Sequence, residues 1–461
     1  MVSRSRLVPL IVASPLFLQN IDTSVMATAL PSIAESLQVP PLHLNLAITS
    51  YLLSLAVFIP ISGWLADRFG AKRVFCLAIV FFSLGSALCG MANTLTELVI
   101  FRILQGLGGA MMVPVGRLIL LRSVPPSQLV SAMVWFTVPA VIGRMVGPLF
   151  GGAIVSMTSW RWIFLINIPF GLLAIFLAMA FVKDTREAEP PVPFDIRGFL
   201  LLALGLSTLL GAMEIAGKAL APGWVSWLAT GIGSLALWVY CVQSRRQEHP
   251  IIDLSILRFK TYRTNILGGT PLRIANGASP FLLPLLLQLG FGLSPLASGA
   301  LTVATAVGAL STRAVMQRTI HGFGFRSLLI SASVLTSLFY MSYGLFSPTT
   351  PHVLMFVMLM LGGLVNSLAM VALATLGFTD VPQRRMSHAT ALSAMSQQLS
   401  LGFGVVLGAT LVSAASWWHG GDAVNLQAED FSPAFVVIGL MTLLSLFSFW
   451  KLDPKEDGGL R

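Results

Sequence analysis

Long runs of apolar residues alternate with short polar segments along nearly the whole chain. A helix needs about 20 apolar residues to cross a hydrocarbon core about 30 Å thick, and fourteen runs reach this length. A count of twelve or thirteen stays open, because the boundaries of the runs are loose by several residues. The fourteen expected spans are 7–33, 44–66, 73–92, 97–121, 128–154, 160–182, 198–217, 222–242, 264–290, 295–316, 327–347, 351–378, 388–415 and 432–450.

The longest polar interruptions fall in the middle of the chain, at 183–197 and 243–263. They bracket two spans and leave six before and six after. This arrangement predicts an all-α polytopic membrane protein built of two six-helix bundles with an inserted helix pair. The expected divisions are an N-terminal bundle over 1–182, cytoplasmic segments and two inserted transmembrane helices over 183–263, and a C-terminal bundle with a cytoplasmic tail over 264–461.

A short internal repeat supports two related bundles. FGAKR at 69–73 lies between the second and third spans, and FGFR at 323–326 lies between the corresponding spans of the second half. A duplicated bundle would place such a match at equivalent turns, as in parallel halves related by an axis along the membrane normal.

Composition and charge restrict the class of protein further. Hydrophobic residues make up 56% of the chain, charged residues 10%, and the mean hydropathy is +0.84, which excludes a soluble domain. Of the 28 Lys and Arg residues, 22 fall on the side of the two termini and two on the opposite side. The positive-inside rule then predicts a multi-pass protein with both termini in the cytoplasm. The net charge of +10 therefore does not indicate nucleic acid.

The fifth expected span combines two features that are costly in lipid. Arg144 lies inside it, and an arginine at the centre of a span costs at least about 2.5–3.5 kcal/mol unless it faces a protein interior or water. Gly143, Gly147 and Gly151 share one helical face, where a neighbouring backbone can approach closely, and Pro148 removes a hydrogen bond beside them. A closely packed helix beside a buried cation suggests a transport pathway.

Two acidic residues fall inside expected spans, Asp22 and Glu214. Glu214 lies four residues before Lys218 near an outer end, which favours a surface pair. Asp22 lies about 22 Å from the cytoplasmic end of its span, at nearly the same depth as Arg102 in the fourth span. The two can pair, and a carboxylate whose solvation and distance from an arginine change can take up and release a proton. The alternative is a static ion pair that joins spans one and four.

Further arginines lie inside spans, and their charge bears on the substrate. If Arg144, Arg273 beside Asn276, and Arg117 face a central cavity, the cavity is cationic and favours an anionic or carboxylate-bearing substrate. The alternative is that they bond to backbone carbonyls or to polar side chains of other spans. The candidate polar partners are Asn366, Gln397 and Gln398.

A glycine-rich charged turn follows the second span, in the sequence SGWLADRFGAKR at 62–73. Glycines permit the turn, and the charges can pair with neighbouring helix ends. This turn resembles the signature loop of the major facilitator superfamily, in which it acts as a cytoplasmic latch. The residues that carry the likeness are Gly63, Asp67, Arg68, Gly70, Lys72 and Arg73.

Other segments resemble the fourteen-span drug:proton antiporters of that superfamily. The likeness runs through LQNIDTSVMATALPSIA at 18–34, FRILQGLGGAMMVPVGR at 101–117, VIGRMVGPLFGG at 141–152 and the linker phrase HPIIDLSILR at 249–258. The sequence departs from the family's motifs at two positions. Ala27 stands five residues after Asp22, where the span-one motif commonly has an asparagine, and Arg144 stands at a position of the span-five motif that is usually small or apolar. The residues that match the antiporter motif of span five are Gly143, Gly147, Pro148, Gly151 and Gly152.

The resemblance implies a proton-coupled antiporter in the cytoplasmic (inner) membrane of a bacterium. It would export small molecules by alternating access, with multidrug efflux as the expected activity. Two alternatives are export of an endogenous organic anion, metal chelate or siderophore-like carboxylate, and a membrane sensor that no longer transports. The sequence holds no GxxxxGK[ST] motif, no His/Cys cluster with metal-ligand spacing and no soluble segment large enough for an enzyme. We therefore expect a non-enzymatic monomer without cofactor or metal, driven by a proton gradient, whose partners are a small-molecule substrate and the lipid bilayer.

Overall fold

The protein is helical throughout the part that the computed structural model describes, which is residues 4–124, 129–182, 193–218, 222–382, 385–420 and 426–452. These ranges hold no strand. Thirteen of their helical segments are long and apolar enough to cross a membrane, and α6 contains a further apolar helix at Ile142–Met157 in the place of the remaining expected span. These helices confirm the predicted all-α polytopic membrane fold. A helix satisfies its backbone hydrogen bonds internally and can therefore lie in lipid.

The helix bounds agree with the expected spans to within a few residues. The elements are α1 (Arg4–Leu37), η1 (Pro41–Leu44), α2 (Asn45–Phe58), η2 (Ile59–Ile61), α3 (Ser62–Phe69), α4 (Ala71–Met91), α5 (Leu95–Ser123), α6 (Leu129–Met157), α7 (Trp162–Leu165), α8 (Asn167–Phe181), α9 (Ile196–Lys218), α10 (Gly223–Ser244), η4 (Leu254–Arg258), α11 (Lys260–Arg263), η5 (Thr264–Gly268), α12 (Gly269–Leu285), η6 (Leu286–Gly290), α13 (Pro295–Tyr343), α14 (His352–Gly377), α15 (Met386–Trp418), α16 (Ala428–Thr442), η8 (Leu443–Ser445) and α17 (Leu446–Phe449).

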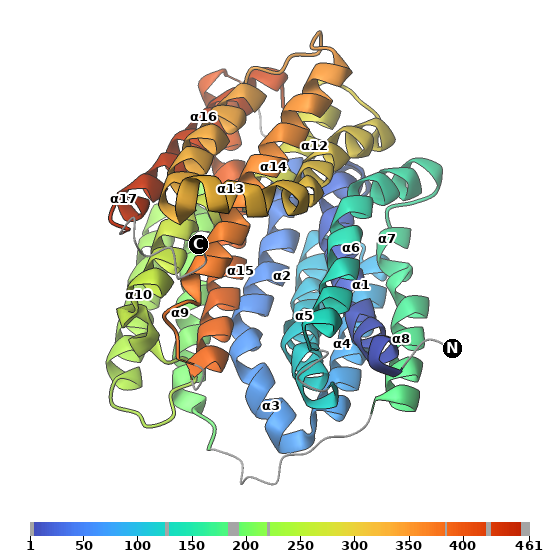
Figure 1. Ribbon diagram of the computed structural model, residues 1–461. Coiled ribbons are helices and arrows are strands. Elements are labelled where there is room, and N and C mark those ends of the chain that lie inside the picture. The colour runs from blue at the N-terminus through green and yellow to red at the C-terminus, as the bar shows by residue number, and fades with distance from the viewer. Residues whose placement is uncertain are drawn as a thin grey trace.

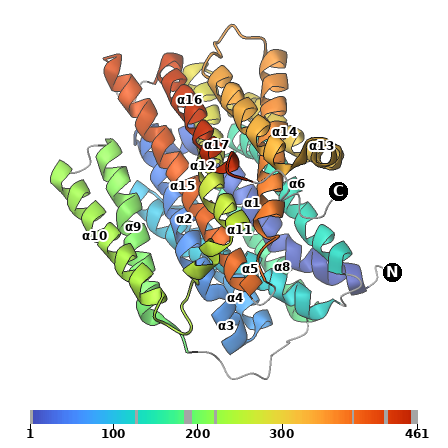
Figure 2. The same cartoon turned by 60° about the vertical axis from the view of Figure 1, so that its left-hand side comes forward.

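The helices pack in two groups with a pair beside them (Figure 1). In the first group α1 contacts α5, α6 and α8, while α5 contacts α2 and α4. In the second group α13 contacts α14 and α16, and α15 contacts α12 and α16. Helices α9 and α10 pack on each other, and α9 contacts both α2 and α15 (Figure 2). The groups meet through α6 with α13, α2 with α15 and α1 with α12.

The two copies of the short sequence repeat adopt the same unusual backbone conformation. Gly70 separates α3 from α4 with a φ of 94°, and Gly324 interrupts α13 with a φ of 71°. Residues with a side chain rarely adopt a positive φ, so glycine is the residue that fits both positions. The single long helix α13 therefore holds two of the expected spans, 295–316 and 327–347, on either side of this break.

The glycine ladder of α6 lies against α1. A Cβ atom added to Gly143 would come within 2.7 Å of the Phe17 carbonyl oxygen, and one added to Gly151 within 2.8 Å of Val25 Cγ1. A Cβ on Gly147 would overlap the Cβ of Ser24. The predicted close approach of a neighbouring backbone is therefore present. Gly152 faces another way, and its added Cβ would overlap the Pro295 carbonyl oxygen of α13.

Enlarging Gly147 should separate α1 from α6. We expect Gly147→Leu to lower the free energy of unfolding by about 1–3 kcal/mol, as overpacking does elsewhere. The matched control is Gly231→Leu in α10, where an added Cβ meets no atom within 4 Å. Thermal unfolding of the detergent-purified variants measures the difference, and equal stability of the two would show that the α1–α6 contact tolerates a side chain.

Candidate functional site

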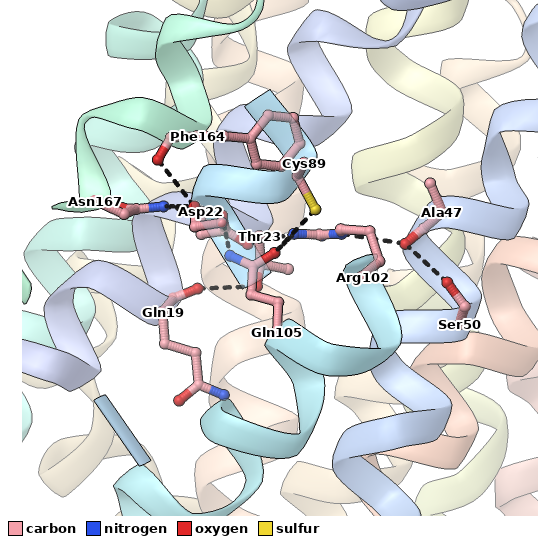
Figure 3. A network of polar contacts seen from close by, with 11 residues as sticks. Gln19, Asp22, Thr23, Ala47, Ser50, Cys89, Arg102, Gln105, Phe164 and Asn167 are labelled. Carbon is pink, nitrogen blue, oxygen red and sulfur yellow. Dashed lines mark hydrogen bonds and ion pairs between the residues drawn. The ribbon is translucent and has the colours of Figure 1, made fainter. Parts of the chain in front are cut away.

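A buried ion pair joins α1 to α5. Asp22 Oδ2 lies 2.6 Å from Arg102 Nη1, as the depth argument anticipated. Asp22 is 2% exposed and Arg102 is fully buried. Figure 3 shows the two side chains meeting among groups from several helices.

Two amides complete the environment of Asp22. Gln105 Nε2 donates to Oδ1 at 2.8 Å, and Asn167 Nδ2 donates to the same oxygen at 3.1 Å. Gln105 Oε1 in turn accepts from Arg102 Nη1 at 2.8 Å, which closes a ring of three side chains. All these contacts to Asp22 are donated to it, which is the arrangement of an ionised carboxylate.

Neighbouring helices hold the pair from further out. Asn167 Nδ2 also donates to Ser86 Oγ at 2.9 Å, which brings α8 and α4 into the network. Arg102 Nε donates to the Ala47 carbonyl at 3.2 Å, and its guanidinium lies 4.4 Å from the centre of the Tyr51 ring on α2. Sequence reasoning did not single out Asn167 or Ser86. The available signal was a polar side chain inside an otherwise apolar span.

The candidate cavity arginines have different environments. Arg144 is exposed and donates from Nη2 to Asn20 Oδ1 on α1 at 3.0 Å. Arg273 is 6% exposed and donates to the Asn265 carbonyl at 2.8 Å and to the Asn265 side chain. The placement of Arg273 in a substrate cavity stays a prediction. Its charge is directed at a carbonyl and an amide oxygen eight residues earlier in the chain, so the alternative of backbone and polar partners holds for it.

The polar residues proposed beside these arginines do not contact them through any described hydrogen bond. Asn366 Nδ2 donates to Asn276 Oδ1 at 3.1 Å and so joins α14 to α12. Gln397 is exposed on α15, and Gln398 beside it is half-buried.

A cavity of about 1520 Å³ lies at the end of the molecule where α3 turns into α4. Its walls come from η2 and α3, α5, residues 193–195, the end of α10, the 245–258 segment and the first turns of α15. Arg117 lines it, whereas Arg144, Arg273, Asn276, Asn366, Gln397 and Gln398 do not. The described ionisable groups of its lining are Asp67, Arg117, Asp195, Arg245, Glu248, His249, Asp253, Arg258, Arg385 and His388.

Acids and arginines are equal in number in this lining, four of each. The cavity at this end is therefore of mixed charge, and a cationic central cavity stays a prediction. Burial acts to raise the pKa of Asp253, but hydrogen bonds from Ser255 and the nearby Arg385 guanidinium lower it below its usual value. Arg385 lies 3.4 Å from Asp253 and also donates to Ser255 Oγ at 2.7 Å. These contacts fasten the segment after α10 to the start of α15 at neutral pH.

The opposite ends of the two groups are in contact. Gln288 Nε2 on η6, which directly follows α12, donates to the Thr28 carbonyl of α1 at 3.0 Å. A Cβ added to Gly299 on α13 would overlap the Pro148 carbonyl of α6. The described part of the chain thus surrounds a cavity at one end and packs tightly at the other.

The charged turn at 62–73 binds to its own group of helices. Asp67 pairs with Arg122 of α5 at 3.0 Å, and Lys72 Nζ donates to the Met179 carbonyl of α8 at 2.8 Å. Arg68 lies 5.1 Å from the Trp64 ring, and Arg73 is exposed. Gly63 has open space around it, so it serves no close helix approach.

The interpretation of Glu214 as a surface residue is wrong. Its side chain is 4% exposed and points from α9 towards α2. Thr49 Oγ1 donates to Oε1 at 2.9 Å and Asn45 Nδ2 donates to Oε2 at 3.2 Å. The side chain of Lys218, its expected partner, lies outside the described side chains.

Comparison with known proteins agrees with this architecture. The family model described as Major Facilitator Superfamily matches residues 16–405. The "Putative multidrug resistance protein MdtD" of Salmonella typhimurium is 38% identical over 457 residues, covering 97% of this chain and 95% of that protein. The protein of the same name from Escherichia fergusonii is 37% identical over 444 residues, covering 95% and 93%.

Solved transporters share the fold at low sequence identity. The D-xylose-proton symporter is 17% identical, with a TM-score of 0.68 and 98% of both chains covered. An inward-facing bacterial homologue of the lysosomal transporter Spinster is 16% identical, with a TM-score of 0.69 and coverage of 98% of this chain and 97% of that one. The chain belongs to the Major Facilitator Superfamily, a class of membrane transporters and not of enzymes. Among known members it is similar over nearly its whole length to MdtD.

The buried ion pair should show strong energetic coupling. We expect Asp22→Asn and Arg102→Met each to lower the free energy of unfolding by about 3–5 kcal/mol, because each leaves a buried charged partner unpaired. The double variant should lose less than the sum of the two single losses. The control is the same cycle on Asp67 and Arg122, where the carboxylate is 53% exposed and coupling should be about 0–1 kcal/mol. Denaturant titration in micelles measures both, and additive losses at Asp22 and Arg102 would contradict the coupling.

Proposed function

We propose that the protein exports small molecules across the bacterial cytoplasmic membrane in exchange for protons. The observation that carries this proposal is the buried carboxylate of Asp22, held by Arg102 and two amides in the core of the first helix group. Membership in the superfamily and the likeness to proteins named for multidrug resistance support efflux of several kinds of compound. The chain acts as a monomer, and the proton gradient takes the place of a cofactor.

The buried pair gives a physical route to proton coupling. When the helices around Asp22 separate from Arg102 or exclude water, the neutral acid is favoured; when water or Arg102 approaches, the carboxylate is favoured. Alternating exposure of the site thus links proton uptake on one side to release on the other. One charge crossing 100 mV supplies about 2.3 kcal/mol, which is enough for useful accumulation.

The orientation follows from the charge distribution of the sequence. With both termini in the cytoplasm, the cavity beside the α3–α4 turn opens to the cytoplasm and the packed end faces outward. This is an inward-facing state, from which residues 1–182 and 264–461 rock against each other as two bundles. The contacts of the 62–73 turn with α5 and α8 hold the cytoplasmic ends of the first bundle together.

The charge of the substrate separates two candidate functions. The mixed lining of the cavity imposes no single charge, which favours efflux of chemically varied compounds. The second candidate is export of an organic anion, favoured by Arg117 in the cavity wall and by the exposed Arg144. Arg273 does not support it, because that side chain is satisfied by Asn265.

Removing the titratable group should uncouple transport. Asp22→Asn is expected to abolish accumulation of ethidium driven by a pH gradient in proteoliposomes, because an amide releases no proton in the physiological range. Counterflow of ethidium without a gradient should persist. The control is Glu35→Gln, an exposed carboxylate near the C-terminal end of the same helix. Gradient-driven accumulation in Asp22→Asn at the rate of the control would remove Asp22 from the coupling step.

The two arginines test the nature of the substrate. If they bind anions, Arg144→Ala and Arg117→Ala should each raise the KM for fluorescein about tenfold or more while changing that for ethidium little, since a charge-assisted hydrogen bond contributes about 1.5–3 kcal/mol. Arg144→Lys should rescue partly by restoring the charge. Arg263→Ala, an exposed position on α11, is the control. Equal effects on both dyes would favour the multidrug function.

A further inference from the structure

Glu214, like Asp22, is an acidic side chain buried among helices of a membrane-spanning protein. It belongs to α9, one of the inserted pair, and yet it contacts α2 of the first group. Intramembrane ionisable residues are costly and are generally retained for a task. Since Glu214 lies four residues before the end of α9, its carboxylate is about 6 Å along the helix axis from that end. The end is the predicted outer one.

The hydrogen bonds around Glu214 suit both the charged and the neutral form. The Thr49 hydroxyl lies 2.9 Å from Glu214 Oε1 and 3.0 Å from the Asn45 carbonyl oxygen, and it has a single proton to donate. When Glu214 is ionised, that proton points at the carboxylate. When Glu214 carries a proton, its own O–H can donate to Thr49 Oγ1 while the Thr49 proton turns to the Asn45 carbonyl. The Thr49 hydroxyl, the Glu214 carboxyl group and the Asn45 carbonyl therefore keep a hydrogen-bond partner in either protonation state.

The same stretch of α2 contacts the Asp22 site. Ala47 lies between the two residues that bind Glu214, and its carbonyl accepts from Arg102 Nε at 3.2 Å. The first turns of α2 therefore carry partners of two buried carboxylates, Asp22 through Arg102 and Glu214 directly. This short stretch of α2 thus connects the two sites structurally.

The surroundings of Glu214 bear other titratable and charged groups. Tyr51 on α2 and Arg102 on α5 form part of the Asp22 network. His43 is half-buried on η1, directly before α2. The remaining such groups within the described parts of α9, α10 and α15 are Arg197, Tyr240, Cys241 and His388, which lie towards the opposite ends of those helices, while the side chain of Lys218 is outside the described ones.

We propose that Glu214 is a second proton-binding site, located on the inserted helix pair and coupled through α2 to the Asp22–Arg102 pair. The bound proton forms an O–H bond with the carboxylate of Glu214 and returns to water at the outer face when α9 and α2 shift. This inference deepens the proposed proton antiport and rests on it. It assigns the inserted helix pair a part in coupling.

Infrared difference spectra between high and low pH test the site directly on the full-length protein in proteoliposomes. Protonated carboxyl groups absorb in their own carbonyl-stretch region, and the wild type should show components from both Asp22 and Glu214. Glu214→Gln is expected to lose one component, and Asp22→Asn a different one. Glu35→Gln, whose carboxylate is exposed, is the matched control for the loss of an acid.

Each result separates this inference from the function on which it rests. A Glu214→Gln spectrum that matches the wild type in the protonated-carboxyl region overturns the second site, whatever Asp22→Asn shows, whereas the Asp22 component tests the antiport proposal alone. If Glu214→Gln does not fold, Thr49→Val gives the answer. Its missing hydroxyl should shift the frequency of the Glu214 component without abolishing it, and an unshifted spectrum would contradict the proposal.

Discussion

The ion pair between Asp22 and Arg102 dictates how the first group of helices is assembled. Two charges placed in an apolar bundle lose their hydration, and only close, well-directed partners offset that loss. The pair therefore draws in Gln105, Asn167 and the Ala47 carbonyl, which come from three helices besides α1. The approach of these helices depends on small residues at the crossings.

Two glycines show how that approach is achieved. A Cβ added to Gly85 of α4 would come within 2.6 Å of the Gln105 backbone, and one added to Gly106 of α5 within 2.6 Å of Ser54 Cβ on α2. In a membrane, where no hydrophobic force drives one helix to another, such close packing is itself a main source of association. Glycine and charge thus cooperate: the first brings the helices near, and the second specifies where they meet.

Much of the architecture was predictable because lipid imposes strong local rules. The length of each apolar run set the helices, and the residue count along spans one and four placed Asp22 beside Arg102. The features that could not be predicted depend on how each helix is rotated about its axis and on contacts between helices that are far apart in the sequence. The burial of Glu214 follows from α9 packing on α2, which no hydropathy pattern encodes.

The partners of the other arginines illustrate the same limit. Arg273 and Asn265 are eight residues apart with η5, a short π-helix, at the beginning of the interval, so an ideal α-helical wheel does not describe their placement. The mixed charge of the cavity arises from Asp195, from the 245–258 segment and from helices α3, α5 and α15, whose relative positions are set only by tertiary packing. Hydropathy was enough to predict the spans, whereas the partners of the buried charges could be identified only from the folded structure.

The inserted helices are attached to both halves of the molecule, at opposite ends. At one end Glu214 of α9 is bound by α2, and at the other the segment following α10 is fastened by Arg385 at the start of α15. The inserted pair thus connects the two helix groups through one contact at each of its ends. In the proposed transport cycle, a tilt of one half against the other would strain these contacts or break one of them, and the inserted pair would then restrict how far the halves can move.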